Sequence, residues 1–309
     1  EEVITTLQEK NLLTESDGAR CVFLDGFLTR DNEPQPLIVQ KSDGGYLYAT
    51  TDLAAINYRC NELMADRVLY VVDARQSMHF QQVFAAAKLA GFANPWNTLE
   101  HISYGTMMGK DGKPFKTRSG DTIKLIDLCD ESIERAYALV TSKNPELGES
   151  ERRHIASIVG IAAIKYADLS KNRNSDYVFD WDSMLSFEGN TAPYLLYAYA
   201  RIRSIFRRAA IDPDGHFNIR INVPDERTLA LKLIQFSEIV ELLAETCLPN
   251  QLCLYLYELA GTFMQFYESC PVLKAEGTER ESRLGLCKLT AETLKKGLEL
   301  LGITTLEQM

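Results

Sequence analysis

The spacing of hydrophobic positions changes character near the middle of the chain. In the first part, Arg67–Asp73 is a nearly continuous apolar run, typical of a strand buried on both faces of a parallel sheet. A helical pattern follows over 78–89 and ends at Gly91, and a second strand is predicted over 99–104. Strand, helix, strand is the order of a doubly wound α/β domain, whose ligands bind beyond the carboxyl ends of the strands.

The residues before this unit are short and mixed in pattern. Residues 20–24 and Leu37–Gln40 have the apolar content of strands and are separated by turn-forming residues. Thr51 and Asp52 are residue types that cap helices, and we expect them to cap a helix that runs to about residue 62.

From about residue 126 onward the period is helical throughout. Six helices are predicted, over 126–142, 150–170, 191–210, 226–247, 250–269 and 282–301. The fold class is therefore an α/β Rossmann-type domain with a partial parallel sheet, followed by an all-α helical bundle. We expect the α/β domain, which includes a small insertion, to span residues 1–150. A connecting helical region over 151–185 and the bundle over 186–309 follow it.

The amino-acid composition argues against several classes of protein. The 309 residues carry 33 basic and 43 acidic side chains, a net charge of −10, which argues against a broad, non-specific nucleic-acid binder but allows a local basic face. The seven cysteines form no C-x-x-C pair and the four histidines are scattered, so we expect reduced thiols and no protein-bound metal. No apolar run approaches the length of about 18 residues that a membrane span needs. We expect a cytoplasmic protein with no membrane partner.

Two segments carry candidate chemistry. Residues 105–124 combine five cations with four glycines and a proline, which suits a polyphosphate, although a solvated loop tip has the same composition. Residues 186–208 place Tyr194, Tyr197 and Arg201 on one helical stripe, followed by Arg203, Arg207 and Arg208. Aromatic rings beside arginines suit stacked single-stranded bases, although a core stripe with a solvated arginine edge fits the spacing equally well.

Four segments in chain order, 48–59, 71–79, 109–120 and 187–194, resemble the arginyl-tRNA synthetases of bacteria. The resemblance implies a class I enzyme with a Rossmann-type catalytic domain and a helical anticodon-binding domain. Such an arginine–tRNA ligase makes arginyl-adenylate from L-arginine and ATP, with Mg²⁺ accompanying the nucleotide, and transfers the arginyl group to tRNA(Arg). We expect a monomer.

The resemblance also implies three sets of site residues. Tyr48, Asp52 and Gln76 match the arginine pocket, and a carboxylate such as Asp52 can accept the planar guanidinium fork in bidentate fashion. Lysine lacks the planar fork, and citrulline lacks its charge. The ATP-binding positions are His101, Tyr104, Gly105, Met107, Lys116 and Arg118. The anticodon-binding positions are Tyr194, Tyr197, Arg201, Tyr267 and Met309.

The basic segment aligns with the lysine loop of class I synthetases, Lys-Met-Ser-Lys-Ser, but here Thr117 replaces the second lysine. We expect Lys116 and Arg118 to stabilise the pyrophosphate leaving group, with Lys113 and Lys110 in reserve. The His-Ile-Gly-His-type element that holds the ATP phosphates in this class does not occur. We therefore expect the chain to be the C-terminal portion of a synthetase and unable to form arginyl-adenylate alone.

Two other functions remain open from the sequence. One is another class I aminoacyl-tRNA synthetase, such as a cysteinyl enzyme, although the scattered cysteines offer no zinc site for its substrate. The other is a non-catalytic tRNA- or RNA-binding module. The set of Tyr48, Asp52 and Gln76 argues against the second function, because a module that binds only RNA needs no guanidinium pocket.

Overall fold

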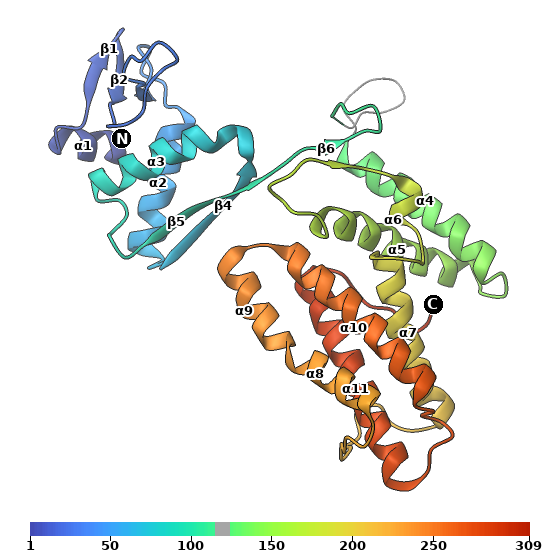
Figure 1. Ribbon diagram of the computed structural model, residues 1–309. Coiled ribbons are helices and arrows are strands. Elements are labelled where there is room, and N and C mark those ends of the chain that lie inside the picture. Colours follow the sequence, from blue (N-terminus) through green and yellow to red (C-terminus); the bar gives the residue numbers. More distant parts are fainter. Residues whose placement is uncertain (115–123) are drawn as a thin grey trace. The chain divides into compact units, whose positions relative to one another are not determined.

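The computed structural model describes residues 1–114 and 124–309. The chain forms two compact units, Glu1–Gly105 and Thr106–Met309 (Figure 1). In the described residues, no helix is long and apolar enough to cross a membrane.

The first unit contains two small sheets and three α-helices. An antiparallel sheet has the order β1-β2-β3, and β4 pairs with β5 in parallel. Helices α2 and α3 pack on each other and share a core with the antiparallel sheet, centred on Leu53, Ile56 and Val83. The elements are α1 (Glu2–Glu9), β1 (Thr14–Ser16), β2 (Ala19–Val22), β3 (Leu37–Gln40), α2 (Tyr48–Asn57), the π-helical turn η1 (Tyr58–Glu62), β4 (Arg67–Asp73), the 3₁₀ turn η2 (Ala74–Gln76), α3 (Ser77–Ala90) and β5 (Thr98–Tyr104).

The parallel pairing of β4 with β5 confirms the predicted parallel sheet. Tyr70 of β4 faces α3, where its ring lies 5.0 Å from that of Phe80, and only 8% of it is exposed. The opposite face of β4 differs from the prediction of burial on both faces. Leu69 is 41% exposed and Val71 is 65% exposed. An apolar run predicts a strand that can be buried on both faces, but only the packing of other elements decides whether it is.

The start of α2 also differs from the prediction. The helix begins at Tyr48, preceded by Leu47 in an extended conformation, so Thr51 and Asp52 lie inside the helix and do not cap it. The Thr51 hydroxyl instead donates to the Tyr48 carbonyl at 2.9 Å. Since the helix starts four residues earlier than expected, Tyr48 and Asp52 occupy positions i and i+4 on one face.

The second unit is mainly helical, as predicted. Its elements are β6 (Met107–Met108), α4 (Leu125–Lys143), α5 (Glu149–Leu169), β7 (Tyr177–Val178), α6 (Trp181–Met184), α7 (Ala192–Ala209), α8 (Pro224–Ile234), α9 (Phe236–Thr246), α10 (Pro249–Ser269) and α11 (Gly277–Leu300). The helix predicted over 226–247 is in fact two helices, α8 and α9. At Gln235 ψ is −13°, far from the α-helical value of about −42°, so the helix breaks there.

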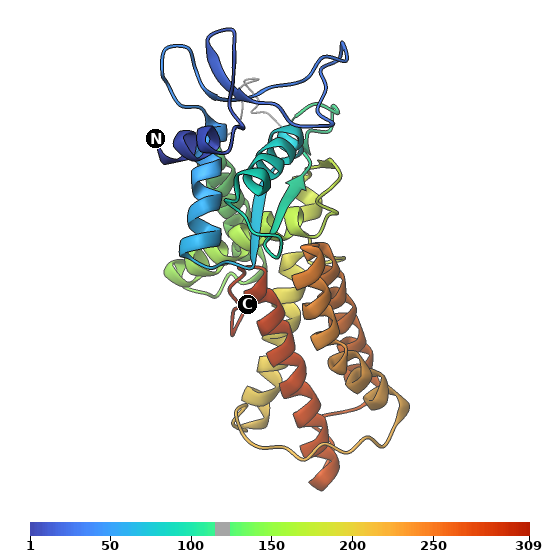
Figure 2. The ribbon, with the colours of Figure 1, turned by 90° about the vertical axis from the view of Figure 1, so that its left-hand side faces the viewer.

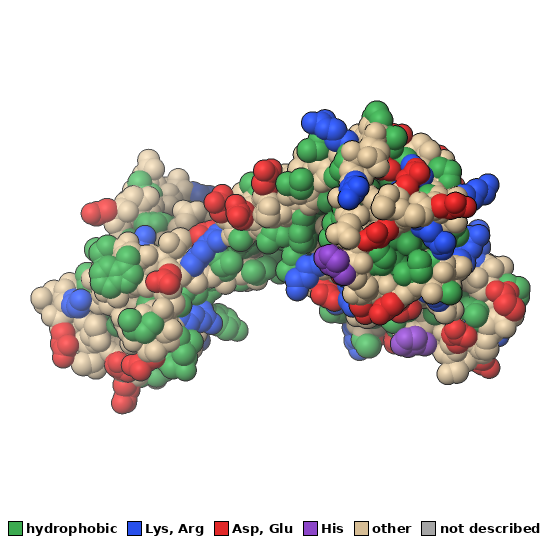
Figure 3. Space-filling view, turned by 90° about the horizontal axis from the view of Figure 1, so that it is seen from below, with side chains coloured by type: hydrophobic (Ala, Val, Ile, Leu, Met, Phe, Trp, Pro, Cys, Tyr) green, Lys and Arg blue, Asp and Glu red, His purple; other side chains and the backbone are tan. Residues whose placement is uncertain are grey.

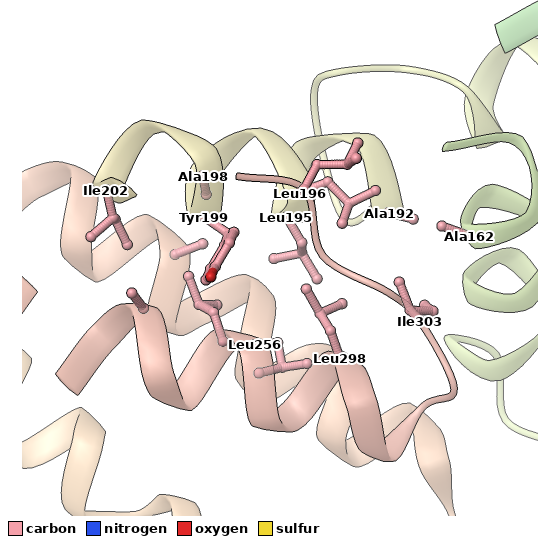
Figure 4. Packing of buried hydrophobic residues seen from close by; sticks show 14 of the residues in the cluster. Ala162, Ala192, Leu195, Leu196, Ala198, Tyr199, Ile202, Leu256, Leu298 and Ile303 are labelled. Carbon is pink, nitrogen blue, oxygen red and sulfur yellow. The ribbon is translucent and has the colours of Figure 1, made fainter. Parts of the chain in front are cut away.

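Helix α7 is central to the packing of this unit. In both Figure 1 and Figure 2 it runs alongside α11, and it also contacts α5 and α10. Figure 4 shows Leu195 and Tyr199 of α7 facing Leu256 of α10 and Leu298 of α11, and Leu195, Leu256 and Leu298 are fully buried. The N-terminus of α7 is capped as expected, because the Thr191 hydroxyl accepts from the Tyr194 N–H at 3.3 Å.

Candidate functional site

Asp52 lies at the centre of the expected arginine pocket in the first unit. Its Oδ2 atom is 2.7 Å from Nε2 of His79 on α3, and each of the two side chains is 27% exposed. A carboxylate only accepts when ionised, so the imidazole nitrogen donates. Tyr48, one turn before Asp52 on α2, is 85% exposed. Asp52 is therefore a half-buried carboxylate that is already oriented by a neighbouring helix.

Gln76 ends the η2 turn, three residues before His79, and is exposed. The His79–Asp52 contact thus joins the start of α3 to α2, the helix of the other two pocket candidates. The structure shows His79 bonded to Asp52, the carboxylate expected to receive the guanidinium. The sequence signal for this role was only its spacing of three residues from Gln76.

Asp73, a second acidic residue beside this turn, is hydrogen-bonded to a residue near it in the chain. Asp73, the last residue of β4, accepts from both the backbone N–H and the Nε of Arg75 at 2.8 Å. These hydrogen bonds, the side-chain bond first, lower the pKa of Asp73 to about 2. Arg75 is thereby paired with Asp73, which fixes the exit of the chain from the strand.

The expected ATP-binding residues fall in different places. The His101 ring lies 5.0 Å from that of Phe80, and its Nε2 bonds to the Val72 carbonyl at 2.9 Å, so this imidazole is used in the packing of β5. Tyr104 is 43% exposed and Gly105 ends the first unit. Met107 belongs to the second unit, where β6 pairs in parallel with β7.

The basic segment is described only in part. Lys116 and Arg118 lie outside the described residues. Lys113 closes a turn in which the Gly109 N–H donates to its carbonyl at 2.7 Å. Lys110 forms an ion pair with Asp180, and that pairing lowers the pKa of Asp180 to about 2. Lys110, a reserve candidate, is thus paired with a carboxylate in this structure. Of the three expected catalytic cations, Lys113 is the one that lies within the described residues.

The expected anticodon-binding residues all lie in the second unit, where Arg201 is close to Tyr267 and Tyr197 shares a cavity with Met309. The Arg201 guanidinium lies over the Tyr267 ring, 5.3 Å from its centroid, which joins α7 to α10 by a cation–π contact. The Tyr194 ring lies 5.5 Å from that of Tyr257, so it is partly used in packing. Tyr197 is 43% exposed. The helical stripe of Tyr194, Tyr197 and Arg201 therefore combines the two alternatives that its sequence left open. Part of it is packed against other helices, and Tyr197 is an exposed aromatic.

Tyr197 and Met309 share a cavity of about 310 Å³, within the range of small ligand pockets. The Phe187 ring lies edge-on to Tyr197, with centroids 6.4 Å apart, and Lys143 and Asn144 from the end of α4 complete the lining. Phe187, Lys143 and Asn144 had not been predicted as site residues. The position of Phe187 in a segment of the family resemblance was a signal, but nothing local connects the end of α4 to α7.

Surface charge is mixed in sign. Figure 3 shows acidic and basic side chains interspersed on the face that it draws, in both units, with hydrophobic side chains between them. Among the described residues, no three His, Cys, Asp or Glu side chains gather in a group that could hold a metal ion. Each of the seven cysteines is a thiol in this structure.

Two family models match the chain. The model "tRNA synthetases class I (R), catalytic domain" matches residues 1–181, and the model "DALR anticodon binding domain" matches residues 195–309. The arginine–tRNA ligase of Laribacter hongkongensis is 59% identical over 308 residues, which are 99% of this chain and 53% of that protein. The chain thus spans about half the length of the curated relatives it matches.

Solved structures are similar over the whole chain. The arginyl-tRNA synthetase of Plasmodium falciparum has a TM-score of 0.85 and 33% sequence identity, with 100% of this chain and 52% of that chain covered. The Thermus thermophilus arginyl-tRNA synthetase has a TM-score of 0.85 and 27% identity, with 100% of this chain and 57% of that chain covered.

Proposed function

The chain belongs to the family of class I arginyl-tRNA synthetases, and on this premise we propose that it supplies the arginine-binding and anticodon-binding parts of an arginine–tRNA ligase. The complete reaction activates L-arginine with ATP and transfers the arginyl group to tRNA(Arg). The observation that carries the proposal is the Asp52 carboxylate, half-buried and bonded to His79 at 2.7 Å on the face of α2 that also bears Tyr48.

The chemistry of recognition follows from that carboxylate. Both oxygens of Asp52 can accept from the two parallel N–H groups of a guanidinium, a charge-assisted pair about twice as strong as a neutral one. Tyr48 and Gln76 are the further pocket residues. Lysine presents a point charge and citrulline presents no charge, so neither reproduces the paired, charged fork.

ATP and tRNA(Arg) are the other proposed partners. For ATP we propose His101, Tyr104, Gly105 and Met107 as contacts, with Mg²⁺ entering as the counter-ion of the nucleotide. Lys113, Lys116 and Arg118 stabilise the pyrophosphate as it leaves. For tRNA we propose that anticodon bases stack on the exposed aromatics of α7, with Tyr194, Tyr197, Arg201, Tyr267 and Met309 in contact.

We keep the division into residues 1–150, 151–185 and 186–309 as the proposed functional division, and we propose a cytoplasmic monomer. Another class I synthetase and a non-catalytic RNA-binding module are not favoured, because relatives 59% identical over 99% of the chain are named arginine–tRNA ligases.

A chimera tests the proposal directly. The 308 matched residues of the Laribacter hongkongensis ligase are replaced by this chain, and arginine-dependent ATP–pyrophosphate exchange and tRNA(Arg) charging are measured. We expect both activities. Asp52→Asn in the chimera should raise the KM for arginine by about 100-fold, because a charged hydrogen-bond partner is lost. A folded chimera that activates lysine as well as arginine, or whose Asp52→Asn variant is unchanged, would refute the pocket.

A further inference from the structure

The C-terminal segment 301–309 runs back onto the helical unit after α11. Leu301, Ile303 and Leu306 are buried in its core, with exposures of 6%, 2% and 6%. Leu306 is the last of these buried anchors. Beyond Leu306, Glu307 and Gln308 are exposed and Met309 is partly buried, so contacts other than core burial are needed to hold these three residues in place.

Glu307 supplies these contacts through one helix. Its Oε1 atom accepts from the Tyr199 hydroxyl at 2.8 Å, and its Oε2 atom accepts from the Arg203 Nε at 2.7 Å. The Glu307 carbonyl accepts from the Arg207 guanidinium at 2.8 Å. The three donors are spaced by four residues along α7, so they lie on one stripe of the helix. Both the side chain and the backbone of Glu307 are therefore held by α7.

The same helix forms the wall of the cavity that contains the chain end. Tyr197 of α7 and Met309 line the cavity of about 310 Å³ together with Phe187. Met309 is packed against the core of the unit. Glu307 is two residues before Met309, so its three bonds to α7 hold the backbone close to the helix that carries Tyr197.

We propose that Glu307 is a positioning residue for RNA binding: its contacts with Tyr199, Arg203 and Arg207 hold Met309 beside Tyr197, and the cavity between them receives an unstacked nucleobase. This inference rests on the proposed function. Two aromatic rings and a thioether present apolar faces suited to a base, and Lys143 and Asn144 at the rim supply a cation and an amide for its polar edge or phosphate. Arg203 and Arg207 each donate a hydrogen bond to Glu307 in the protein's own C-terminal segment.

The test uses the chain itself and two readouts. The first is the ¹³C-methyl NMR signal of Met309, which reports whether the tail is held. The second is the dissociation constant for an anticodon stem-loop RNA carrying an arginine anticodon, measured by fluorescence anisotropy at one fixed salt concentration. Glu307→Gln removes the carboxylate charge and one of the two acceptor oxygens that face Tyr199 and Arg203, so the Met309 signal should narrow and shift toward that of a free methionine. RNA binding should weaken by about tenfold.

A matched control is Glu292→Gln. Glu292 has the same residue type and nearly the same exposure, 56% against 57%, but its ion pair is with Lys288 at 3.9 Å and not with the tail. Both readouts should be unchanged in this variant. In the double variant Glu307→Gln with Met309→Ala, RNA binding should be no weaker than in Met309→Ala alone, because Glu307 acts through Met309.

The outcomes distinguish a failure of the role assigned to Glu307 from a failure of the proposed RNA binding. Unchanged RNA affinity in Glu307→Gln, or additive losses in the double variant, would overturn the positioning role while leaving the proposed function intact. Failure of the unaltered chain to bind the stem-loop would overturn the proposed RNA contact at this unit, and the role of Glu307 in RNA binding with it.

Discussion

His79 donates from Nε2 to Oδ2 of Asp52 across 2.7 Å, which joins two helices at residues 27 positions apart. The Asp52 carboxylate has about four acceptor positions, so it can hold this bond and still accept from a guanidinium. What His79 contributes is orientation, because a carboxylate that rotates freely pays rotamer entropy when it binds a planar fork.

The first prediction concerns that bond. In the ligase chimera, His79→Leu removes the donor and should raise the KM for arginine by about three- to tenfold, with a smaller effect on kcat. His79→Gln retains an N–H donor on a side chain of similar reach and should stay within about twofold of the unaltered chimera. Steady-state ATP–pyrophosphate exchange measures both values. Equal KM values for the Leu and Gln variants would show that the donor has no role.

A second prediction concerns a buried ion pair in the helical unit. Glu226 is fully buried, and its Oε1 accepts from the Arg283 Nε at 2.9 Å. Glu226→Gln removes one of the two carboxylates that pair with the 7% exposed Arg283, while Glu279 remains as the other, and it should lower the free energy of unfolding by about 1–3 kcal/mol. Chemical denaturation followed by helical circular dichroism measures the loss. Glu238→Gln, at an exposed position of α9, is the control and should shift the midpoint little.

The same carboxylate makes a pH-dependent contribution. Burial by itself raises the pKa of Glu226, but hydrogen bonds from the Asn222 N–H, the Arg283 guanidinium and the Val223 N–H outweigh it and the pKa is lowered. The stabilisation is therefore present above the unfolded pKa of about 4.3 and is lost as the pH falls through the lower folded value.

We expect the stability difference between the unaltered chain and Glu226→Gln to be constant near neutral pH and to shrink below about pH 4. Denaturation midpoints of both chains across this range measure it. A difference that grows on acidification would mean that the folded pKa is raised and that the assignment of the hydrogen bonds is wrong.

A fourth prediction uses two glycines in helices. A Cβ added at Gly160 of α5 would lie 2.8 Å from the backbone of Ile133 on α4, whereas one added at Gly261 of α10 would have nothing within 4 Å. Gly160→Ala should destabilise by about 1–3 kcal/mol because two helix backbones must separate. Gly261→Ala should stabilise by about 0.5–1 kcal/mol because alanine loses less entropy in a helix. Thermal unfolding of the two variants should therefore shift in opposite directions.

Local structure was largely predictable from the chain. The apolar run at 67–73, the helix after it and the strand over 99–104 predicted the parallel pair that β4 and β5 form. The helical period after residue 126 predicted the all-α unit. These features depend on which face of each segment is apolar, and that is encoded in residues a few positions apart.

The predictions that were wrong concern features that depend on contacts between segments. The helix start at Tyr48 and the break at Gln235 carry no strong capping or breaking residue, so packing determined them. The open face of β4, with Val71 65% exposed, depends on which elements cover the strand. Periodicity describes a segment's own faces but does not say what lies against them.

The residue pattern was sufficient for the fold class, for most of the helices and strands, and for the residue types that suit a guanidinium, a nucleotide and an RNA loop. It did not reveal which of these side chains are held by others in the folded chain: Asp52 by His79, Lys110 by Asp180, and Arg203 by Glu307, 104 residues away. Such pairings depend on how whole helices pack, because a side chain can bond only to what the fold places within about 3 Å of it, whatever its distance along the chain.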